Sequence, residues 1–356
     1  MEKKILVTGA GGLIGYETSK FFLENGYQVL GIDNNLREYF FGKGGDTTPN
    51  VSELTNRYNS FKNHNFDLRN REKVLEFLKS EGHFDLIVHT AAQPSHDWAA
   101  KEPFTDFDVN ALATLNLLEG FRLYSPKGTF IFTSTNKVYG DNPNKANIIE
   151  NEEKYDYHNF QNIKGISEKG INEEMSLDHC KHSLFGASKV AADIICQEYG
   201  RYFGLNVGIF RGGCLTGPQH SAVELHGFLS YIIDCATNKK PYTIFGYKGK
   251  QVRDQIHSSD VVNAFYHFYK NPKKGIAYNL GGCKENSASV LEIIRLLKEE
   301  FDLHLNYKYQ EQNRIGDHIC YYSDMSKFKK DFPDWKIRND LLKIIGDVVI
   351  KKKKIV

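Results

Sequence analysis

The stretch TGAGGLIG, residues 8–15, follows the short apolar run KKILVT and opens a segment with helical periodicity. Its glycines have the GxxGxxG spacing of a dinucleotide-binding turn. Gly9 permits a tight turn, Gly12 lets backbone approach a pyrophosphate, and Gly15 allows the helix to pack closely on the strand. The free N–H groups at the start of the helix then face the phosphates. The order of strand, glycine turn and helix therefore predicts a dinucleotide site.

A second strand-like run, QVLGID (28–33), ends in Asp33. A carboxylate at this point accepts hydrogen bonds from both hydroxyls of the adenosine ribose and repels a 2′-phosphate. Asp67, in NFDLRN, is placed after the third strand to meet the adenine. We therefore predict NAD rather than NADP as the cofactor.

Strand and helix signals alternate through the rest of the first half. Strands are expected at 84–90 and 129–135, and helices at about 71–81, 103–124 and 184–203. Alternation of this kind predicts an α/β fold, a doubly wound Rossmann sheet of parallel strands with helices on both faces.

The pattern loosens after residue 210. We expect helices at 225–237, 258–270 and 287–301, and strands at 242–246 and 277–282. The last strand is expected to return to the sheet, which makes a smaller C-terminal substrate domain discontinuous. The predicted domains are 1–208 with about 252–285 for NAD, and about 209–251 with 286–356 for the substrate. The polar segment 141–181 is too long for a simple linker, and its part 156–182 is expected to cover the substrate.

Composition limits the class of protein. The 356 residues are 40% hydrophobic and 25% charged, and the formal net charge is +2, which gives no reason to expect nucleic-acid binding. No apolar run approaches the roughly 20 residues that span a bilayer, and we expect no signal peptide and no membrane association. Six scattered cysteines form no CxxC pair and no metal-like cluster. We therefore expect a cytoplasmic protein without a metal, ending in a solvated tail of lysines (351–354).

Longer stretches match one enzyme family. They are TGAGGLIG with GIDNN (31–35), HTAAQPS (89–95), DVNALATLNLLE (108–119), STNKVYGD (134–141), GKQVRDQIHSSDVVNAF (249–265) and NRIGDH (313–318). Over nearly its whole length the chain resembles the extended short-chain dehydrogenase/reductase family, whose members rework nucleotide sugars. STNKVYGD and GKQVRD are most similar to the branch of CDP-tyvelose (CDP-paratose) 2-epimerases, which hold NAD tightly.

The resemblance implies functional residues. Thr135 matches the residue that hydrogen-bonds the reacting oxygen, and Lys189 matches the lysine that supports a tyrosinate base and reaches the nicotinamide ribose. The implied cofactor-binding residues are Gly9, Gly12, Leu13, Ile14, Gly15, Asp33, Asn34, Asp67, Leu68, Ala91, Ala92, Gln93, Asn110 and Lys189. The implied substrate-binding residues are Asn136, Gly213, Arg253 and Arg314. Of these, the two arginines would hold the diphosphate, because a guanidinium fork meets phosphate oxygens bidentately.

The stretch HSLFGASKVAAD (182–193) departs from the family at one position. The family has a tyrosine one helical turn before the lysine, whose charge lowers the pKa of the phenol. This chain has Phe185 there, which has no proton to exchange. Lys137 is the leading candidate to carry the proton instead, since a desolvated lysine titrates near neutrality. Weaker candidates are Tyr139, His182, Cys214 and His220.

Three explanations of Phe185 stay open: a natural enzyme with another base, a Tyr→Phe substitution made to trap a substrate, and a binding protein without turnover. A shift of register is disfavoured because FGASK aligns cleanly with YxxxK. We favour an active enzyme that epimerises a nucleotide-activated sugar, with a CDP-sugar preferred, through transient oxidation to a keto-sugar and return of the hydride. The alternatives are a nucleotide-sugar dehydratase or oxidoreductase, and a non-catalytic NAD and sugar-nucleotide binding protein. The resemblance also implies a homodimer formed through the helices near 103–124 and 184–203.

Overall fold

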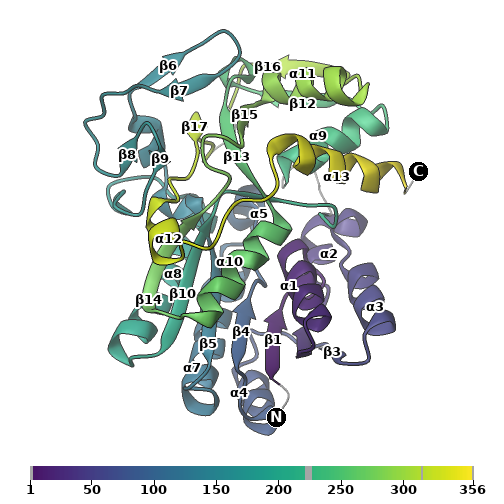
Figure 1. Cartoon of the computed structure of the whole chain (residues 1–356), viewed down its shortest axis with the longest axis vertical. Helices are drawn as coiled ribbons and strands as arrows, with labels where there is room; N and C mark the ends of the chain where they lie inside the picture. The colour runs from purple at the N-terminus through teal and green to yellow at the C-terminus, as the bar shows by residue number, and fades with distance from the viewer. Residues whose placement is uncertain (1–2, 221–226, 314–315, 355–356) are drawn as a thin grey trace. The chain divides into compact units, whose positions relative to one another are not determined.

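A computed structural model of the chain describes residues 3–220, 227–313 and 316–354 (Figure 1). Its contacts divide the chain into two units, which we describe separately. The first unit is Met1–Val138, Leu184–Arg211 and Val261–Tyr278, and the second is Tyr139–Ser183, Gly212–Asp260 and Asn279–Val356. These bounds differ from the domain bounds expected from the sequence in four places: 139–183, 252–260 and 279–285 fall in the second unit, and 209–211 fall in the first.

One seven-stranded sheet forms the centre of the first unit, in the order β14-β10-β5-β4-β1-β2-β3. The strands are β1 (Lys4–Thr8), β2 (Gln28–Ile32), β3 (Phe61–His64), β4 (Leu86–His89), β5 (Thr129–Thr135), β10 (Asn206–Gly212) and β14 (Lys274–Leu280). The pairs from β5 to β3 are parallel, as connections through helices require. The strand expected at 277–282 is confirmed, since β14 returns to the edge of this sheet.

Helices cover both faces of the sheet (Figure 1). They are α1 (Leu13–Glu24), α4 (Arg71–Glu81), α7 (Ala113–Tyr124), α8 (Ser183–Tyr202) and α10 (Ser258–Lys270). Apolar residues of α4, α7 and α8 form one buried cluster with the sheet. On the other face α1 and α10 lie side by side, with the rings of Phe22 and Tyr266 in contact. Because both faces are covered, strands such as β4 are buried at every residue.

The helix predicted at 103–124 is not continuous. It consists of α6 (Pro103–Phe107), a π-helical turn (Asp108–Leu112) and α7. A π-helical turn inside a helix often marks a functional site, since it redirects side chains that an unbroken helix would place elsewhere. This turn contains Asn110, one of the predicted cofactor residues.

The other elements of the first unit are shorter. They are α2 (Leu36–Phe41), η1 (Gly42–Gly45), α3 (Thr48–Arg57), α5 (His96–Lys101) and the 3₁₀ turn η3 (Asn136–Tyr139), whose last residue belongs to the second unit.

Short strands make up the sheets of the second unit. β13 (Val252–His257) pairs with β11 (Cys214–Thr216), β15 (Ser287–Ser289) and β17 (Cys320–Tyr321), and β12 (Tyr242–Phe245) pairs with β16 (Tyr307–Gln310). The segment expected to be a long loop contains η4 (Asn142–Lys145) and two antiparallel pairs, β6 (Ile148–Glu150) with β7 (Tyr155–Tyr157) and β8 (Ile166–Ser167) with β9 (Gly170–Ile171).

A second apolar cluster joins three helices of this unit. The helices of the unit are α9 (Phe228–Thr237), α11 (Val290–Phe301), α12 (Ser326–Asp331) and α13 (Leu341–Lys353), with the 3₁₀ turn η5 (Tyr247–Gly249). The cluster contains buried residues of α9, α11 and α13. The helix predicted at 287–301 begins three residues late, because Ser289 forms a capping box with Glu292 and 287–289 are strand.

The sequence predicted a solvated tail for the C-terminal lysine run, and this prediction is wrong. Helix α13 continues to Lys353, and Lys352 pairs with Asp234 at 3.3 Å. Cations at the end of a helix are stabilised by its dipole. In the described parts of the chain, no helix combines the length and the apolar content that crossing a bilayer requires.

Candidate active site

The glycine turn has the geometry that its spacing predicts. Gly9 lies at φ +67° and donates its N–H to Ile32 O at 2.7 Å, which ties the turn to β2. A side chain on Gly9 would meet the Ala91 backbone at 2.8 Å, and one on Gly15 would collide with Gly9 O. A side chain on Gly12 would meet only Gly9 O, at 3.3 Å, among the described residues within 4 Å, so the outer side of this glycine is open.

The start of α1 is suited to an anion. Its N-cap is Gly12, which has no side chain to cap the first N–H groups, and the first turn carries no acidic residue. The N–H groups of Leu13 and Ile14 therefore have no partner within the helix and lie at the positive end of its dipole. A diphosphate fits this end.

Asp33 lies directly beyond β2 and next to the glycine turn. Its carboxylate accepts hydrogen bonds from Gly11 N at 2.8 Å, Asn35 N at 2.9 Å and the Thr47 hydroxyl at 3.0 Å. These bonds fix its orientation and leave acceptor capacity for ribose hydroxyls. The neighbouring Asn34 turns back to accept from Leu36 N at 3.2 Å. Sequence reasoning missed Thr47, which no spacing from the glycine turn identifies.

The segment after β3 carries Asp67 and the buried Leu68. Asp67 is paired with Arg69 at 2.6 Å. Burial alone would raise the pKa of Asp67, but hydrogen bonds from Arg69 hold it below the ordinary value. Asn116 of α7 donates to Leu68 O at 3.0 Å, which fixes the segment against the helix.

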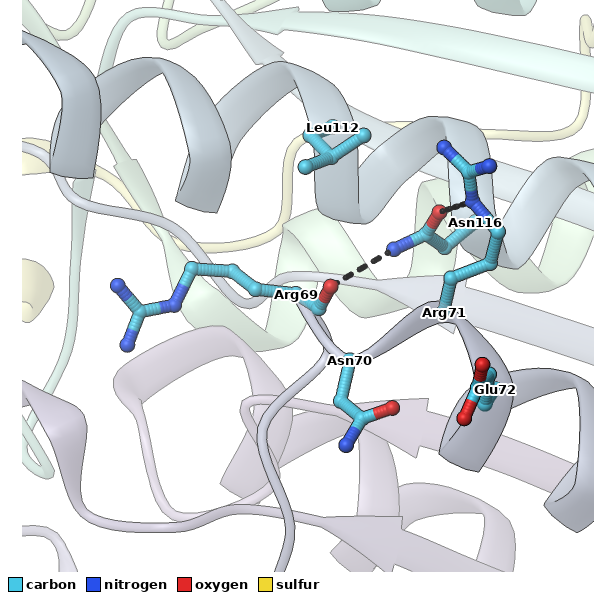
Figure 2. Close-up of a pocket in the computed structure, with 6 residues that line it drawn as sticks. All are labelled: Arg69, Asn70, Arg71, Glu72, Leu112 and Asn116. Carbon is cyan, nitrogen blue, oxygen red and sulfur yellow. Dashed lines mark hydrogen bonds between the residues drawn. The ribbon is translucent and has the colours of Figure 1, made fainter.

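A surface pocket of about 350 Å³ lies beside this segment (Figure 2). Its lining residues are Arg69, Asn70, Arg71, Glu72, Leu112 and Asn116. Figure 2 shows Asn116 between the Arg69 carbonyl and the Arg71 guanidinium, both at 3.4 Å. The pocket therefore adjoins the proposed adenine contacts and does not include Asp67 itself.

Residues Ala91, Ala92 and Gln93 follow β4, at the same edge of the sheet as the glycine turn. Gln93 is fully buried and exchanges two hydrogen bonds with Asn110, N to Oδ1 and Nδ2 to O, both at 3.0 Å. Asn110 Nδ2 also donates to Asp106 at 3.0 Å and contacts Ser188 Oγ at 3.1 Å. The π-helical turn thus connects the loop after β4 to helix α8.

Thr135 ends β5, and the 3₁₀ turn η3 begins at the next residue. Its half-buried hydroxyl lies 3.4 Å from Asn136 Oδ1 and accepts from Lys137 N at 3.3 Å. Asn136 is buried and Lys137 is half-buried. The three predicted residues therefore form one short turn.

Lys189 and Phe185 lie one turn apart on α8, and both are buried. Lys189 Nζ donates to Thr133 O at 2.8 Å and lies 4.3 Å from the centre of the Phe132 ring. Burial lowers the pKa of Lys189 to about 8. Strand β5 thus carries Thr135 and also holds the Lys189 ammonium. Position 185, where the family has a phenol, carries a hydrocarbon ring in this chain.

A buried ion pair supports this arrangement, and sequence reasoning missed it. Asp193, four residues after Lys189, accepts two parallel bonds from Arg211 of β10, at 2.9 and 3.0 Å. Ser134, the residue before Thr135, donates to the same carboxylate at 2.6 Å. The pair therefore joins α8 to β5 beside the two predicted catalytic residues.

The predicted substrate residues lie in the second unit, apart from Asn136. Arg253 is largely buried on β13 and lies 3.4 Å from Asp317, and Arg314 is outside the described residues. A side chain on Gly213 would lie 2.5 Å from Asp254 Oδ1, so this glycine makes room for a buried carboxylate. Burial raises the pKa of Asp254 to about 6.

The four weaker candidates for the missing base also lie in the second unit. Tyr139 is fully buried and donates its hydroxyl to Asn279 at 2.7 Å. His182 lies 3.6 Å from Cys180 Sγ. Cys214 is on β11, and His220 is buried.

Known proteins resemble this chain in sequence and in fold. The model of the NAD dependent epimerase/dehydratase family matches residues 5–281. CDP-paratose 2-epimerase of Salmonella typhi is 32% identical over 341 residues, 93% of this chain and 94% of that protein. UDP-glucose 4-epimerase of Neisseria meningitidis serogroup C is 28% identical, over 97% of this chain and 96% of that protein.

Solved structures agree on the fold. UDP-glucuronic acid 4-epimerase from Bacillus cereus, in complex with UDP-glucuronic acid and NAD, has a TM-score of 0.77 at 22% identity and covers 99% of this chain and 100% of that one. This likeness confirms the predicted doubly wound α/β fold. The matching family is NAD dependent, which makes NAD the cofactor. Since the family model covers most of the chain and one relative exceeds 30% identity, this chain belongs to the NAD dependent epimerase/dehydratase family.

Proposed function

We propose that this chain epimerises a nucleotide-activated sugar by oxidising one sugar carbon to a keto group and returning the hydride to its opposite face. The proposed substrate is a CDP-sugar of the tyvelose type, supported by the 32% identity to CDP-paratose 2-epimerase. The observation that carries the proposal is the buried Lys189 ammonium of α8, which donates to Thr133 O at 2.8 Å and is thereby held against β5, the strand that ends in Thr135.

Each proposed catalytic residue has a distinct task. When bound, NAD supplies the hydride acceptor and donor. The Thr135 hydroxyl donates a hydrogen bond to the reacting sugar oxygen, and Lys189 holds the nicotinamide ribose. Phe185 moves no proton. Lys137 places a cation in the Thr135 turn, and the sequence alone makes it one candidate for the proton carrier.

The proposed substrate contacts are Arg253, Arg314, Asn136 and Gly213. Arg253 is the best supported, because its guanidinium is directed by bonds to Val252 O and Asp317 and retains donors for a phosphate oxygen. Arg314 is proposed to hold the same diphosphate from the sequence alone.

Incubation of the purified protein with CDP-, UDP-, GDP- and dTDP-hexoses tests the function. We expect a new epimer from a CDP-hexose by NMR without net NADH absorbance at about 340 nm, because epimerisation regenerates its cofactor. Lys189→Met should lower turnover at least ~100-fold. Accumulation of a keto product would instead indicate the dehydratase or oxidoreductase.

A non-catalytic binding protein is the second candidate function, and Phe185 is the observation that favours it. The substitution Phe185→Tyr separates the two. An active wild type supports the epimerase, whereas a wild type that binds CDP-hexose without product and gains turnover on Phe185→Tyr supports the binding protein or a trapped mutant.

We also propose a homodimer formed by α7 and α8, which are neighbours because Tyr199 donates to Glu119 at 3.0 Å. Large apolar side chains are exposed on these helices and on α6: Phe104, Phe107, Leu123, Leu184, Ile194 and Tyr202. Light scattering should give twice the mass of 40.7 kDa. Ile194→Glu should give the monomer mass, while Ile350→Glu, in the second unit, should not. A monomeric wild type would refute the dimer.

A cytoplasmic location is proposed because all six cysteines are free thiols, as is usual in reducing compartments. Recovery of the native protein from the secreted fraction with oxidised cysteines would refute it.

A further inference from the structure

A titratable side chain, that of His96, contacts Phe185. The imidazole of His96 packs edge to face on this ring, with ring centres 5.1 Å apart and planes at 77°. His96 is half-buried and is the first residue of α5, which follows the loop after β4. It lies 89 residues before Phe185 in the chain and belongs to the same unit.

One buried hydrogen-bond network holds the two residues together. On the side of His96, Gln93 donates to Ser95 O at 2.9 Å and to Asp106 at 2.7 Å, which fixes the loop that ends at His96. On the side of Phe185, Ser188 donates to Phe185 O at 3.0 Å.

Asn110 joins the two halves of this network. It exchanges hydrogen bonds with the Gln93 backbone and lies 3.1 Å from Ser188 Oγ. The groups that form this network are buried, and they fix the backbone on both sides of the contact between His96 and Phe185. Pre-organisation of this kind is typical of catalytic groups.

We propose that His96 is the acid–base residue that replaces the missing phenol. The proposal rests on the epimerase function proposed above. A substrate hydroxyl placed where it would approach a tyrosine at position 185 would meet the imidazole that packs on this ring, directly or through one bridging water. The neutral imidazole takes the hydroxyl proton as the O–H bond breaks and the carbon loses its hydride, for which bound NAD would be the acceptor. On return of the hydride to the keto carbon, the imidazolium gives the proton back to the oxygen.

This assignment separates the tasks of His96 and Lys137. An imidazole is largely neutral near pH 7 and has a lone pair for a proton. A lysine ammonium has no such lone pair. Lys137 therefore stabilises the developing negative charge on the sugar oxygen, and His96 carries the proton.

The test uses the full chain with NAD and the nucleotide sugar on which the wild type acts. Loss of a general base typically costs ~10²–10⁴-fold, so His96→Ala should lower kcat at least ~100-fold. Added imidazole should restore part of this activity, because it fits the space that the side chain leaves. His96→Gln fills that space and should not respond to imidazole. The exposed His83→Ala serves as the matched control and should keep wild-type kcat.

A double variant tests the exchange of one base for the other. Adding Phe185→Tyr to His96→Ala should raise kcat at least ~10-fold over His96→Ala alone, since a phenol beside Lys189 can carry the same proton. A purely structural role of His96 predicts no gain from imidazole or from the phenol.

Two results would overturn the assignment. The first is a His96→Ala variant that keeps more than about a third of wild-type kcat, since a lost base costs ~10²-fold or more. The second is a loss of activity that neither imidazole nor Phe185→Tyr reverses in a variant with unchanged NAD binding and melting temperature. If the wild type acts on no nucleotide sugar, the proposed function is refuted. This result is independent of the His96 variants.

Discussion

Replacing Asp193 with alanine should lower the free energy of unfolding by about 3–5 kcal/mol, because it leaves the Arg211 charge buried without a counterion. Asp193 is fully buried and Arg211 is 4% exposed, so water does not replace the lost carboxylate. The variant also removes the acceptor for Ser134 and Gln197, both at 2.6 Å. Urea denaturation followed by circular dichroism measures the loss.

An exposed ion pair gives the matched control. Arg295 and Glu153 lie 3.1 Å apart with side chains 42% and 40% exposed, so Glu153→Ala should cost less than about 1 kcal/mol. The double variant Asp193→Leu/Arg211→Met should recover most of the stability, since it removes both buried charges. A cost below about 1 kcal/mol for Asp193→Ala would show that Arg211 finds another partner or water.

The second large effect is a loss of stability in acid through His89. This side chain is 1% exposed, and burial lowers its pKa to about 3. Thr114 donates its hydroxyl to Asn110 O at 2.6 Å and therefore accepts from His89 Nε2 at 3.0 Å, so the Nδ1 of a neutral ring accepts from Thr8 at 2.7 Å. We assign this tautomer from the hydrogen-bond network.

The direction of the pH effect on stability follows from the pKa of His89 in the folded chain, about 3, and in the unfolded chain, about 6.5. Below pH ~6.5 the unfolded chain binds a proton at His89 and the folded chain does not, so stability is full above that pH and falls as the pH drops towards 3. Between pH 7.5 and 5.0 this group should remove about 2 kcal/mol from the free energy of unfolding.

Comparison of variants isolates this contribution from other groups that titrate in the same range. For His89→Asn the difference in unfolding free energy between pH 7.5 and 5.0 should be smaller than in the wild type by about 2 kcal/mol. The exposed His304→Gln should leave that difference unchanged. If the unfolding free energy changes by the same amount between pH 7.5 and 5.0 in His89→Asn and in the wild type, His89 is accessible to protons in the folded state.

Much of the first unit could be predicted because its signals are local. The strands β1, β2, β4 and β5 and the helix α4 lie within two residues of their predicted bounds. The π-helical turn around Asn110 was missed, because it lies inside a helix and leaves no periodic signal; the Asn110 side chain bonds to Gln93 and Ser188, which are distant in the chain.

The second unit was harder to predict, since its strands have two to six residues and pair with distant segments. β12 and β16 are separated by more than 60 residues, and β13 has three partner strands. The hairpins within 141–181 were expected as a loop, because strands of two or three residues show no alternation of polar and apolar side chains.

The sequence alone determined the dinucleotide turn, the parallel sheet, the family and the absence of a phenol at position 185. Each of these depends on residues close together in the chain, where spacing translates directly into geometry. The tertiary structure alone decided that Asp193 and Arg211 form a buried pair beside Thr135, and that His96 contacts Phe185. Such contacts depend on how strands and helices pack, and no local pattern of residues records which distant side chains that packing brings together.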